Sequence, residues 1–332
     1  MSILPRGEFM DAISTTEANR PGPVPPVQLS IQIIGKLQVR RGDEVLEAHH
    51  FGGPKPRQIL EILLLALGTP VSKDRLIEKL WGDHPPAESM ATLESYVSVL
   101  RRHLQPGAGK AGPLRTSNGG YVMDPSLVEL DLDRFNSLMR VVRASPPPIA
   151  YPLLQQALEL SAVPLLADEL RPEWAQEERV LHSARVTAAL ILAAETACVL
   201  QEPGEGIRWA QRALDTDPLN ESAWTALVSA LEQAGRHTEG LQAYERCRRA
   251  LDRELGCSPG PRLRAAQVRL LRATADGESE LADVLAALLV LHGRVEEHAG
   301  HNPIPSEPAL GKTVRLAGEV LSSFLQKALA TA

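Results

Sequence analysis

Cysteine and aromatic residues are scarce in this chain of 332 residues, and their scarcity argues against some classes of protein. There are three cysteines, and no two of them form a Cys-x-x-Cys pair. A disulfide framework or a structural zinc site is therefore not expected, and a reducing cytosol is the natural compartment. Aromatic residues make up 4% of the sequence, whereas Ala and Leu are abundant, which favours helix.

Long hydrophobic runs are lacking as well. The N-terminus has no basic region followed by an apolar stretch, so we expect no signal peptide. The longest apolar runs, such as residues 62–67, are too short to span a bilayer. We therefore expect a cytoplasmic protein without a membrane partner.

Motifs for catalysis, nucleotide binding and metal binding are absent or incomplete. Residues 311–313 read Gly-Lys-Thr, like the end of a phosphate-binding loop, but Ser306 stands where that loop requires glycine. No Gly-x-Ser-x-Gly elbow occurs, and three histidines between positions 292 and 301 lack paired cysteines or an HExxH spacing. We expect no catalytic residue, no metal and no cofactor, and hence a protein that is not an enzyme.

Charge is distributed unevenly along the chain, whose formal net charge is -6. Residues 27–125 contain twelve Lys and Arg against ten Asp and Glu, whereas residues 126–332 contain 21 against 28. Charge effects fade over a Debye length of roughly 8–10 Å. A mildly basic N-terminal domain can therefore attract a phosphate backbone at short range although the whole chain is acidic.

The N-terminal part of the chain first shows a proline-rich leader and then an alternating pattern. Residues 1–26 end in NRPGPVPP, and proline disfavours both helix and strand pairing, so we expect a flexible leader. From residue 27 onward apolar and polar residues alternate, with a break at Gly35 and a Gly-Asp turn at 42–43. This alternation predicts a small antiparallel sheet.

Three helices and a hairpin are predicted next. The first follows the prolines at 54 and 56, the second starts after Ser72, a good N-cap, and the third runs from near Ala87 to Leu104. The sequence Ser-Asn-Gly-Gly at 117–120, between two short extended runs, predicts a hairpin. The order of sheet, three helices and hairpin is typical of a winged helix-turn-helix domain, which we place at residues 27–126.

Helical patterns fill residues 127–275, and part of this region repeats. Residues 205–212 align with residues 239–246 at an offset of 34, the period of tetratricopeptide-type helix pairs. We expect an all-α repeat domain in which each unit stacks on its neighbours, with a third unit extrapolated across 151–187. The fold class is thus mainly α, with small antiparallel sheets in the N-terminal domain.

Residues 276–332 contain two further helical patterns, separated by a proline-containing stretch. They are expected to form a C-terminal helical extension. One interpretation is a pair of helices that caps the repeat stack. The other is a dimerisation or partner-binding helix, since an apolar stripe runs through the last pattern.

The third helix of the N-terminal domain is the best candidate for a functional site. Its apolar residues recur at steps of four, three and four from Leu93 to Leu104, whereas hydroxyls and guanidinium groups occupy the other face. A helix fits the major groove of DNA, where its N-terminal part reaches base edges. The residues expected at base edges are Ser89, Thr92, Glu94 and Ser95. The residues expected at phosphates on this helix are Tyr96, Ser98, Arg101 and Arg102. A solvated helix on a generic globular domain is the alternative interpretation.

Further basic and polar residues around this helix favour the DNA interpretation. Lys55, Arg57 and Lys73 lie near the starts of the two preceding helices, where free N–H groups and positive charge both attract phosphate. For any one of these lysines, a solvated surface position is an equal alternative. The expected wing consists of Arg115, Thr116, Ser117 and Asn118.

Several stretches resemble the Streptomyces antibiotic regulatory protein (SARP) family. They include GGPKPRQILEILLLA, VSKDRLIEKLWGDHPP, TLESYVSVLRRHL, TSNGGYVMD, VELDLDRF and AGRHTEGLQAYERCRRALDRELGCSPGPRL. In this family an OmpR-type winged helix, a two-component-type effector domain, precedes a bacterial transcriptional activation domain. The resemblance covers residues 27–275, but the family often has Asn where this chain has Ala91 and Arg where it has Val99. The bases read by this chain are therefore expected to differ, or its contacts to be fewer.

The resemblance implies a sequence-specific activator of antibiotic biosynthesis genes that binds direct repeats near promoters. It implies double-stranded DNA and RNA polymerase holoenzyme, including its sigma factor, as partners, with a homodimer on DNA in the nucleoid. The alternative function is a protein-interaction scaffold whose repeat domain binds a peptide or small effector.

Overall fold

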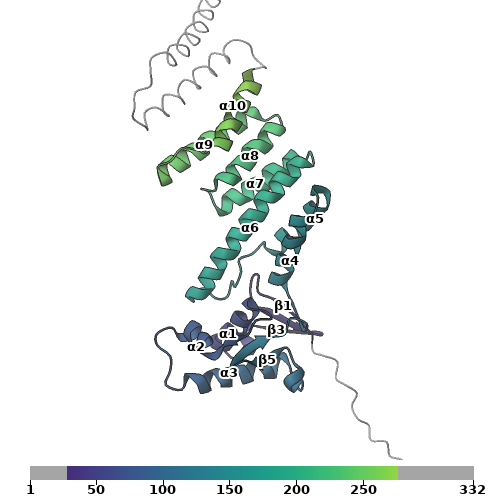
Figure 1. Ribbon diagram of the computed structural model, residues 1–332, viewed down its shortest axis with the longest axis vertical. Coiled ribbons are helices and arrows are strands. Elements are labelled where there is room, and N and C mark those ends of the chain that lie inside the picture. Colours follow the sequence, from purple (N-terminus) through teal and green to yellow (C-terminus); the bar gives the residue numbers. More distant parts are fainter. Residues whose placement is uncertain (1–27, 276–332) are drawn as a thin grey trace, which may run out of the picture. The chain divides into compact units, whose positions relative to one another are not determined.

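The computed structural model describes residues 28–275, and within them the chain forms two compact units (Figure 1). The first contains residues 28–30 and Val39–Glu129, and the second contains Ile31–Gln38 and residues 130–275. The predicted leader at 1–26 and the predicted extension at 276–332, with the Gly-Lys-Thr sequence and the three histidines, lie outside the described residues.

The first unit has the element order expected of a winged helix-turn-helix domain. Its elements are β1 (Leu29–Gln32), β2 (Gln38–Arg41), β3 (Glu44–Glu47), η1 (Ala48–Phe51), α1 (Pro54–Leu65), β4 (Val71–Ser72), α2 (Lys73–Trp81), α3 (Ser89–Leu104), η2 (Gly109–Ala111), β5 (Leu114–Ser117), β6 (Gly120–Met123) and β7 (Val128–Leu130). Strands β1, β2 and β7 each include residues of both units.

Two small sheets flank the three helices. One has the strand order β3-β2-β1-β7, and β1 alternates buried and exposed residues as its sequence predicts. The other has the order β4-β6-β5, with both strand pairs antiparallel. Because β4 immediately precedes α2, this second sheet fixes the hairpin of β5 and β6 beside the start of that helix.

Local signals explain where the helices of this unit begin. Pro54 occupies the first position of α1, where its missing N–H leaves no hydrogen bond unmade. The Ser72 side chain caps α2 by accepting a hydrogen bond of 3.2 Å from the Arg75 N–H. The helices pack on one another through buried residues, which are Ile59, Leu60, Leu63, Leu64, Leu76, Leu80, Leu93, Val97, Leu100 and Leu104.

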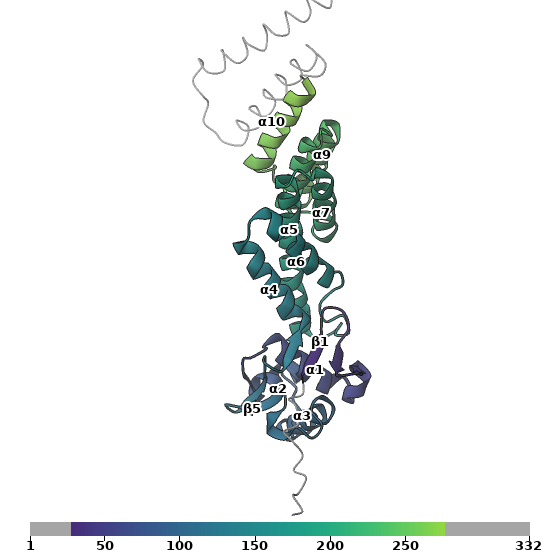
Figure 2. The same cartoon turned by 90° about the vertical axis from the view of Figure 1, so that its right-hand side faces the viewer.

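The second unit is a stack of helices that follow one another in sequence order (Figures 1 and 2). Its helices are α4 (Asp131–Ala144), α5 (Pro147–Leu160), α6 (Glu173–Val199), α7 (Pro203–Thr216), α8 (Glu221–Gln233), α9 (His237–Leu255) and α10 (Pro261–Ala275). A continuous core runs through them, with Leu190, Trp209 and Leu227 among its buried residues.

The 34-residue repeat is visible in the helix boundaries. Helix α9 begins 34 residues after α7, and α8 ends 34 residues after α6. The extrapolated third unit across 151–187 stays a prediction, and its residues cover most of α5 and the first part of α6, which pack on each other. Helix α5 also packs on α4.

Helix α6 is long and apolar enough to cross a membrane, although the apolar runs of the sequence are short. An 18-residue window in it has a mean hydropathy of 1.2, and 44% of that window is buried inside the protein. It packs against α5, α7 and α8, and its residues Ala189, Leu190, Ala193 and Ala194 belong to the core. These contacts are those of the core helix of a repeat stack.

A short N-terminal segment belongs to the second unit through backbone hydrogen bonds. The Leu166 N–H donates to the Ile33 carbonyl and the Gly35 N–H donates to the Pro164 carbonyl, each at 2.8 Å. The carboxylate of Asp131 accepts from the N–H groups of Ile33 and Ile34 at 3.1 and 2.9 Å. Burial raises the pKa of Asp131, although these hydrogen bonds act in the opposite direction.

Candidate nucleic-acid interface

Helix α3 has one buried face and one exposed face, as its sequence predicts. Leu93, Val97, Leu100 and Leu104 are fully or almost fully buried against the other helices of the unit. Its exposed residues are Met90, Ala91, Glu94, Ser95, Ser98 and Arg102. Ser89 and Thr92 are partly exposed at its N-terminal end. The exposed face therefore offers small hydroxyls, one carboxylate and one guanidinium, with one methionine side chain near its start.

The two positions at which the chain departs from the family differ in exposure. Ala91 is exposed on the polar face of α3. Val99 is partly buried, and a Cβ built at Gly52 would lie 3.6 Å from the nearest methyl of Val99. The change at Ala91 therefore bears directly on what this face can contact, whereas Val99 is engaged in packing.

Lys73 and Glu94 form an ion pair between α2 and α3. The Lys73 Nζ lies 2.6 Å from the Glu94 Oε1, and the two side chains are 25% and 53% exposed. The hydrogen bond to Glu94 raises the pKa of Lys73 above its usual value. A residue expected at phosphates and a residue expected at base edges are thus paired with each other.

Tyr121 of β6 connects the exposed face of α3 with the wing. Its ring centroid lies 5.7 Å from the Arg101 guanidinium carbon and 5.9 Å from the Lys73 Nζ, so two cations contact one aromatic ring. The Tyr121 side chain is almost fully buried, and this burial is the main reason for its raised pKa.

Arg101 also holds the wing through hydrogen bonds. Its Nε donates to the Leu114 carbonyl at 3.2 Å, and its terminal nitrogen donates to the Thr116 hydroxyl at 2.8 Å. Arg102, the next residue, is exposed, and its side chain has no hydrogen bond or ion pair within residues 28–275. The two neighbouring arginines therefore serve different purposes in the folded protein.

A two-residue turn forms the wing tip, as the Asn-Gly sequence predicts. Asn118 and Gly119 both have positive φ, at 47° and 73°, which fits a type I′ hairpin turn. At Gly120 an added Cβ would lie 2.0 Å from the Val71 carbonyl oxygen. Glycine is therefore required there for β6 to approach β4.

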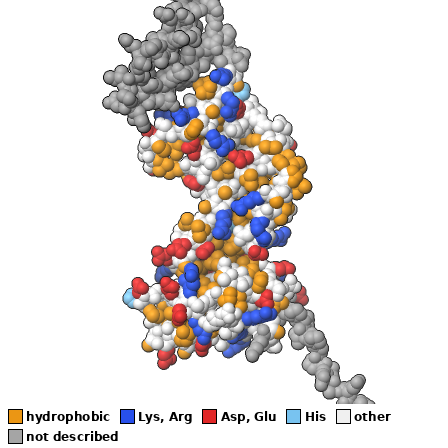
Figure 3. All heavy atoms as spheres, in the orientation of Figure 1, with side chains coloured by type: hydrophobic (Ala, Val, Ile, Leu, Met, Phe, Trp, Pro, Cys, Tyr) orange, Lys and Arg blue, Asp and Glu red, His pale blue; other side chains and the backbone are white. Residues whose placement is uncertain are grey.

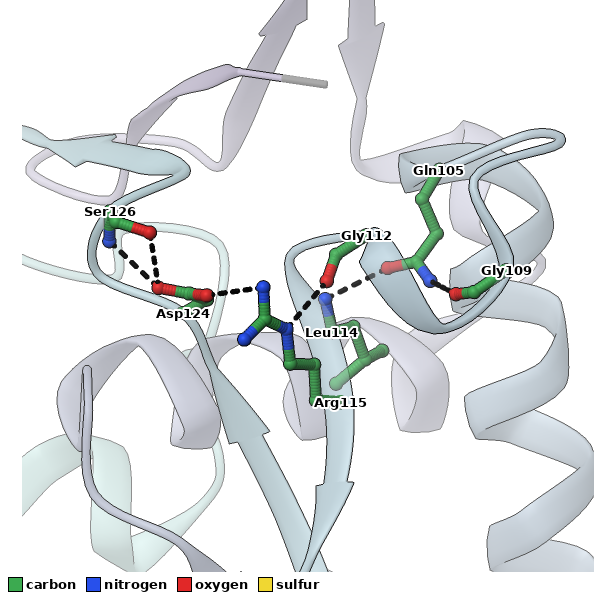
Figure 4. Close-up of polar contacts among 7 residues, drawn as sticks. All are labelled: Gln105, Gly109, Gly112, Leu114, Arg115, Asp124 and Ser126. Carbon is green, nitrogen blue, oxygen red and sulfur yellow. Dashed lines mark hydrogen bonds and ion pairs between the residues drawn. The ribbon is translucent and has the colours of Figure 1, made fainter. Parts of the chain in front are cut away.

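The base of the wing is held by two polar clusters (Figure 4). The Arg115 guanidinium donates to the Asp124 carboxylate at 2.6 Å and to the Gly112 carbonyl at 3.3 Å. The pKa of Asp124 is lowered mainly by its hydrogen bonds from Ser126, and to a smaller extent by the positive charge of Arg115. Arg115, expected in the wing, therefore has an intramolecular carboxylate partner.

The buried amide of Gln105 forms the second cluster, at the end of α3. Its oxygen accepts from the Leu114 N–H at 2.8 Å, and its nitrogen donates to the Gly109 carbonyl at 2.9 Å (Figure 4). One side chain thus joins the end of α3 to β5, the first strand of the wing.

Lys55, expected at phosphates, is engaged within the unit. Its ammonium donates to the Leu80 carbonyl near the end of α2 and lies 5.8 Å from the centroid of a Trp81 ring. Arg57 is partly buried and also has an interaction partner. Of the cations expected at phosphates, Arg102 therefore presents the most accessible charge.

Charges of both signs are interspersed over the visible face of the first unit (Figure 3). No broad field of one sign covers that face, so any attraction to a phosphate backbone depends on individual positions. Within residues 28–275, no group of three or more His, Cys, Asp or Glu side chains could hold a metal ion.

The sequence does not point to Tyr121 and Gln105, which position the wing, and although Gly120 is part of the predicted hairpin, the sequence does not show why glycine is required there. The Gly-Gly-Tyr sequence signalled a hairpin but not the approach of β6 to β4. Nothing in the sequence signals the role of Gln105, because its partners are backbone groups brought near by folding.

Two family models match this chain in the same order as its units. Residues 51–123 match the C-terminal domain of transcriptional regulatory proteins, and residues 130–271 match the bacterial transcriptional activator domain. The first match includes the three helices and the wing, and the second covers α4 to α9 and most of α10.

Three comparisons with known proteins agree with these matches. The regulatory protein DnrI of Streptomyces peucetius is 31% identical over 245 residues, which are 69% of this chain and 90% of DnrI. The regulatory protein AfsR of Streptomyces coelicolor is 32% identical over 269 residues, but this chain spans a quarter of AfsR. The structure of Mycobacterium tuberculosis EmbR, solved with a low-affinity phosphopeptide, superposes with a TM-score of 0.67. The two sequences are 27% identical, and the superposition covers 80% of this chain and 71% of the EmbR chain.

Three observations lead to the same family. They are the winged helix, the repeat domain that follows it in sequence, and a match that covers 90% of DnrI. The chain belongs to the Streptomyces antibiotic regulatory protein family of transcriptional activators, with an OmpR-type DNA-binding domain followed by a bacterial transcriptional activation domain.

Proposed function

We propose that the protein activates transcription of antibiotic biosynthesis genes by placing α3 in the major groove of promoter DNA. The observation that carries this proposal is the exposed face of α3, which presents small hydroxyls beside a wing that Arg101 and Tyr121 hold in place. Small polar side chains can approach base edges closely, and the groove admits a helix.

In this proposal Ser89, Thr92, Glu94 and Ser95 contact base edges, and Tyr96, Ser98 and Arg102 contact phosphates. Lys55, Arg57, Lys73 and Arg101 add positive charge, while their present partners also make them part of the domain's framework. The wing residues Arg115, Thr116, Ser117 and Asn118 would lie against the neighbouring backbone.

The proposal extends to the arrangement on DNA. Residues 27–126 would bind DNA, residues 127–275 would form the activation domain, and residues 276–332 would be an extension of it. Two protomers would bind a direct repeat head to tail, since a palindrome would instead require two-fold symmetry. The activation domain would contact RNA polymerase holoenzyme, including its sigma factor, and the protein would reside on the nucleoid.

Footprinting of the full-length chain on promoters near its own gene tests this function. We expect protection of direct repeats, with affinity that falls steeply as salt rises, because phosphate contacts release counterions. Equal affinity for upstream and random duplexes would contradict sequence-specific binding. Binding to neither would favour a protein-interaction scaffold.

Substitutions on α3 test the base-reading residues. Thr92→Ala and Ser95→Ala should change the bases selected from a random-sequence pool, with little effect on the salt dependence, because neither residue carries charge. Ser183→Ala, the same change at an exposed position of α6, is the matched control. If all three variants selected the same bases as the wild type, α3 would not be docked as proposed.

A further inference from the structure

The ion pair between Lys73 and Glu94 lies where the protein would meet DNA. Lys73 is the first residue of α2, and its N–H lies 3.4 Å from the carbonyl of Gly119 at the wing tip. Glu94 is on the exposed face of α3, one residue before Ser95. A carboxylate at this place repels phosphates and also neutralises a lysine that could bind one.

The contact between Lys73 and Glu94 is short, but both side chains are accessible enough to exchange partners. Its 2.6 Å contact is that of a charge-assisted hydrogen bond. Both side chains are nevertheless accessible to water, and exposed ion pairs contribute little to stability. Replacement of Glu94 by a phosphate as the partner of Lys73 would therefore cost the fold little.

We propose that Glu94 is an intramolecular competitor of the DNA backbone for Lys73, and that this competition determines specificity. The inference rests on the proposed docking of α3 in the major groove. On random DNA, Glu94 keeps Lys73 neutralised, because guanine and thymine edges offer the carboxylate only acceptors and the N7 acceptor of adenine lies beside its amino donor. At the correct site, a cytosine N4 amino group donates to Glu94, and Lys73 moves to a phosphate.

This exchange makes one contact conditional on another. Correct bases give two favourable contacts at once, whereas incorrect bases give neither. Glu94 thus lowers affinity for all DNA that lacks the cytosine, which is discrimination by repulsion as well as attraction.

Binding of the full-length chain to a random-sequence duplex, measured over a range of salt concentrations, tests the proposal. Glu94→Gln should bind random duplex about threefold to tenfold more tightly, with a log–log salt slope steeper by about 0.9, because Lys73 gains a phosphate. In duplexes selected from a random pool, one cytosine position should become degenerate. Glu78→Gln, which removes the same charge from an exposed position of α2, should change affinity less than twofold.

The double variant Lys73→Gln/Glu94→Gln separates exchange from a simple loss of negative charge. If Lys73 is the group released, the double variant should lose the gain in affinity and the steeper slope that Glu94→Gln produces. Persistence of the gain without Lys73 would overturn the proposal, as would equal gains for Glu94→Gln and Glu78→Gln.

The outcome also distinguishes this proposal from the proposed function. A wild-type chain that binds no duplex, while its circular dichroism shows it folded, would overturn both. A wild-type chain that selects a sequence but shows no effect of Glu94→Gln would overturn the exchange alone. Thermal melting of each variant identifies any loss of folding, which is not expected at these exposed positions.

Discussion

At the scale of single residues, Arg101 and Arg102 show how neighbours in sequence differ in the folded protein. Arg101 donates hydrogen bonds to Leu114 and Thr116 and lies over Tyr121. Arg102 is exposed and has no such partner within residues 28–275. The first is therefore a positioning residue for the wing, and the second presents an uncommitted charge.

Arg102→Ala should weaken binding to all duplexes about equally and reduce the log–log salt slope by about 0.9, because one phosphate contact is lost. Its melting temperature should match that of the wild type. Arg101→Ala should in addition speed amide hydrogen exchange in β5 and β6, which lose their link to α3. The measurements are salt-dependent affinity and hydrogen exchange.

Arg143→Ala on α4 is the control, because it removes the same charge from an exposed position in the other unit. Equal effects of Arg102→Ala and Arg143→Ala would mean that Arg102 does not contact DNA. Unchanged exchange in Arg101→Ala would mean that the wing does not depend on that side chain.

At the scale of elements, the wing is determined by one close backbone approach and by side chains from α3. The turn at Asn118 and Gly119 could be predicted locally, because its φ values suit those residue types. The pairing of β6 with β4 requires the absence of a side chain at Gly120. The hairpin is therefore a local feature, whereas its position is a tertiary one.

Gly120→Ala should destabilise the first unit by about 1–3 kcal/mol, the usual cost of forcing an extra methyl into a packed site. Hydrogen exchange of the amides in β4, β5 and β6 should report the loss, since the chain has two units and a single unfolding transition is not assumed.

Gly204→Ala in α7 is the matched control, because a Cβ there would meet no atom within 4 Å. It should leave stability unchanged or raise it by up to about 1 kcal/mol, since Ala favours helix over Gly. Wild-type exchange in Gly120→Ala would refute the close approach of β6 to β4.

At the scale of the whole molecule, we expect a buried histidine to make stability depend on pH. His182 of α6 is 3% exposed, and its ring lies 5.1 Å from that of Phe135 in an edge-to-face contact. Neither ring nitrogen has a hydrogen-bond partner among the described residues. Burial, with a smaller effect from Arg185, lowers the pKa of His182 to about 4.

The neutral imidazole therefore predominates in the folded protein, whereas the unfolded chain titrates at its ordinary pKa near 6.5. Between these values the unfolded state binds more protons, so stability falls as pH falls from about 6.5 to about 4. The full loss is on the order of 3 kcal/mol, from about 1.4 kcal/mol per pKa unit.

His182→Phe should flatten this part of the curve of unfolding free energy of the second unit against pH, measured by hydrogen exchange of the core amides of α6 between pH 4 and 7. Carboxylates such as Glu245, whose hydrogen bond to Arg248 lowers its pKa to about 2, titrate in both proteins and cancel in the comparison. Parallel curves for wild type and variant would contradict the assignment to His182.

The amino-acid sequence alone predicts the sheet, three helices and hairpin of the first unit, the helical character of the second unit and the family. The helix starts at Pro54 and after Ser72, the apolar face of α3 and the turn at Asn118 are local features, set by φ preferences, capping and periodicity. The 34-residue repeat is likewise readable from side-chain spacing. Its extension to a third unit across 151–187 stays a prediction: α5 and α6 pack on each other there, and α6 continues to Val199, beyond the end expected for that unit.

Which charged side chains have partners within the protein depends on the tertiary fold. Lys55 donates a hydrogen bond to the Leu80 carbonyl, and Arg101 donates one to Thr116 in the wing. Lys73 donates a hydrogen bond to Glu94, which is 21 residues away in sequence. A residue type signals what a side chain can bind. Its actual partner depends on which backbone and side-chain groups folding brings within hydrogen-bond distance, and local preferences contain no such information.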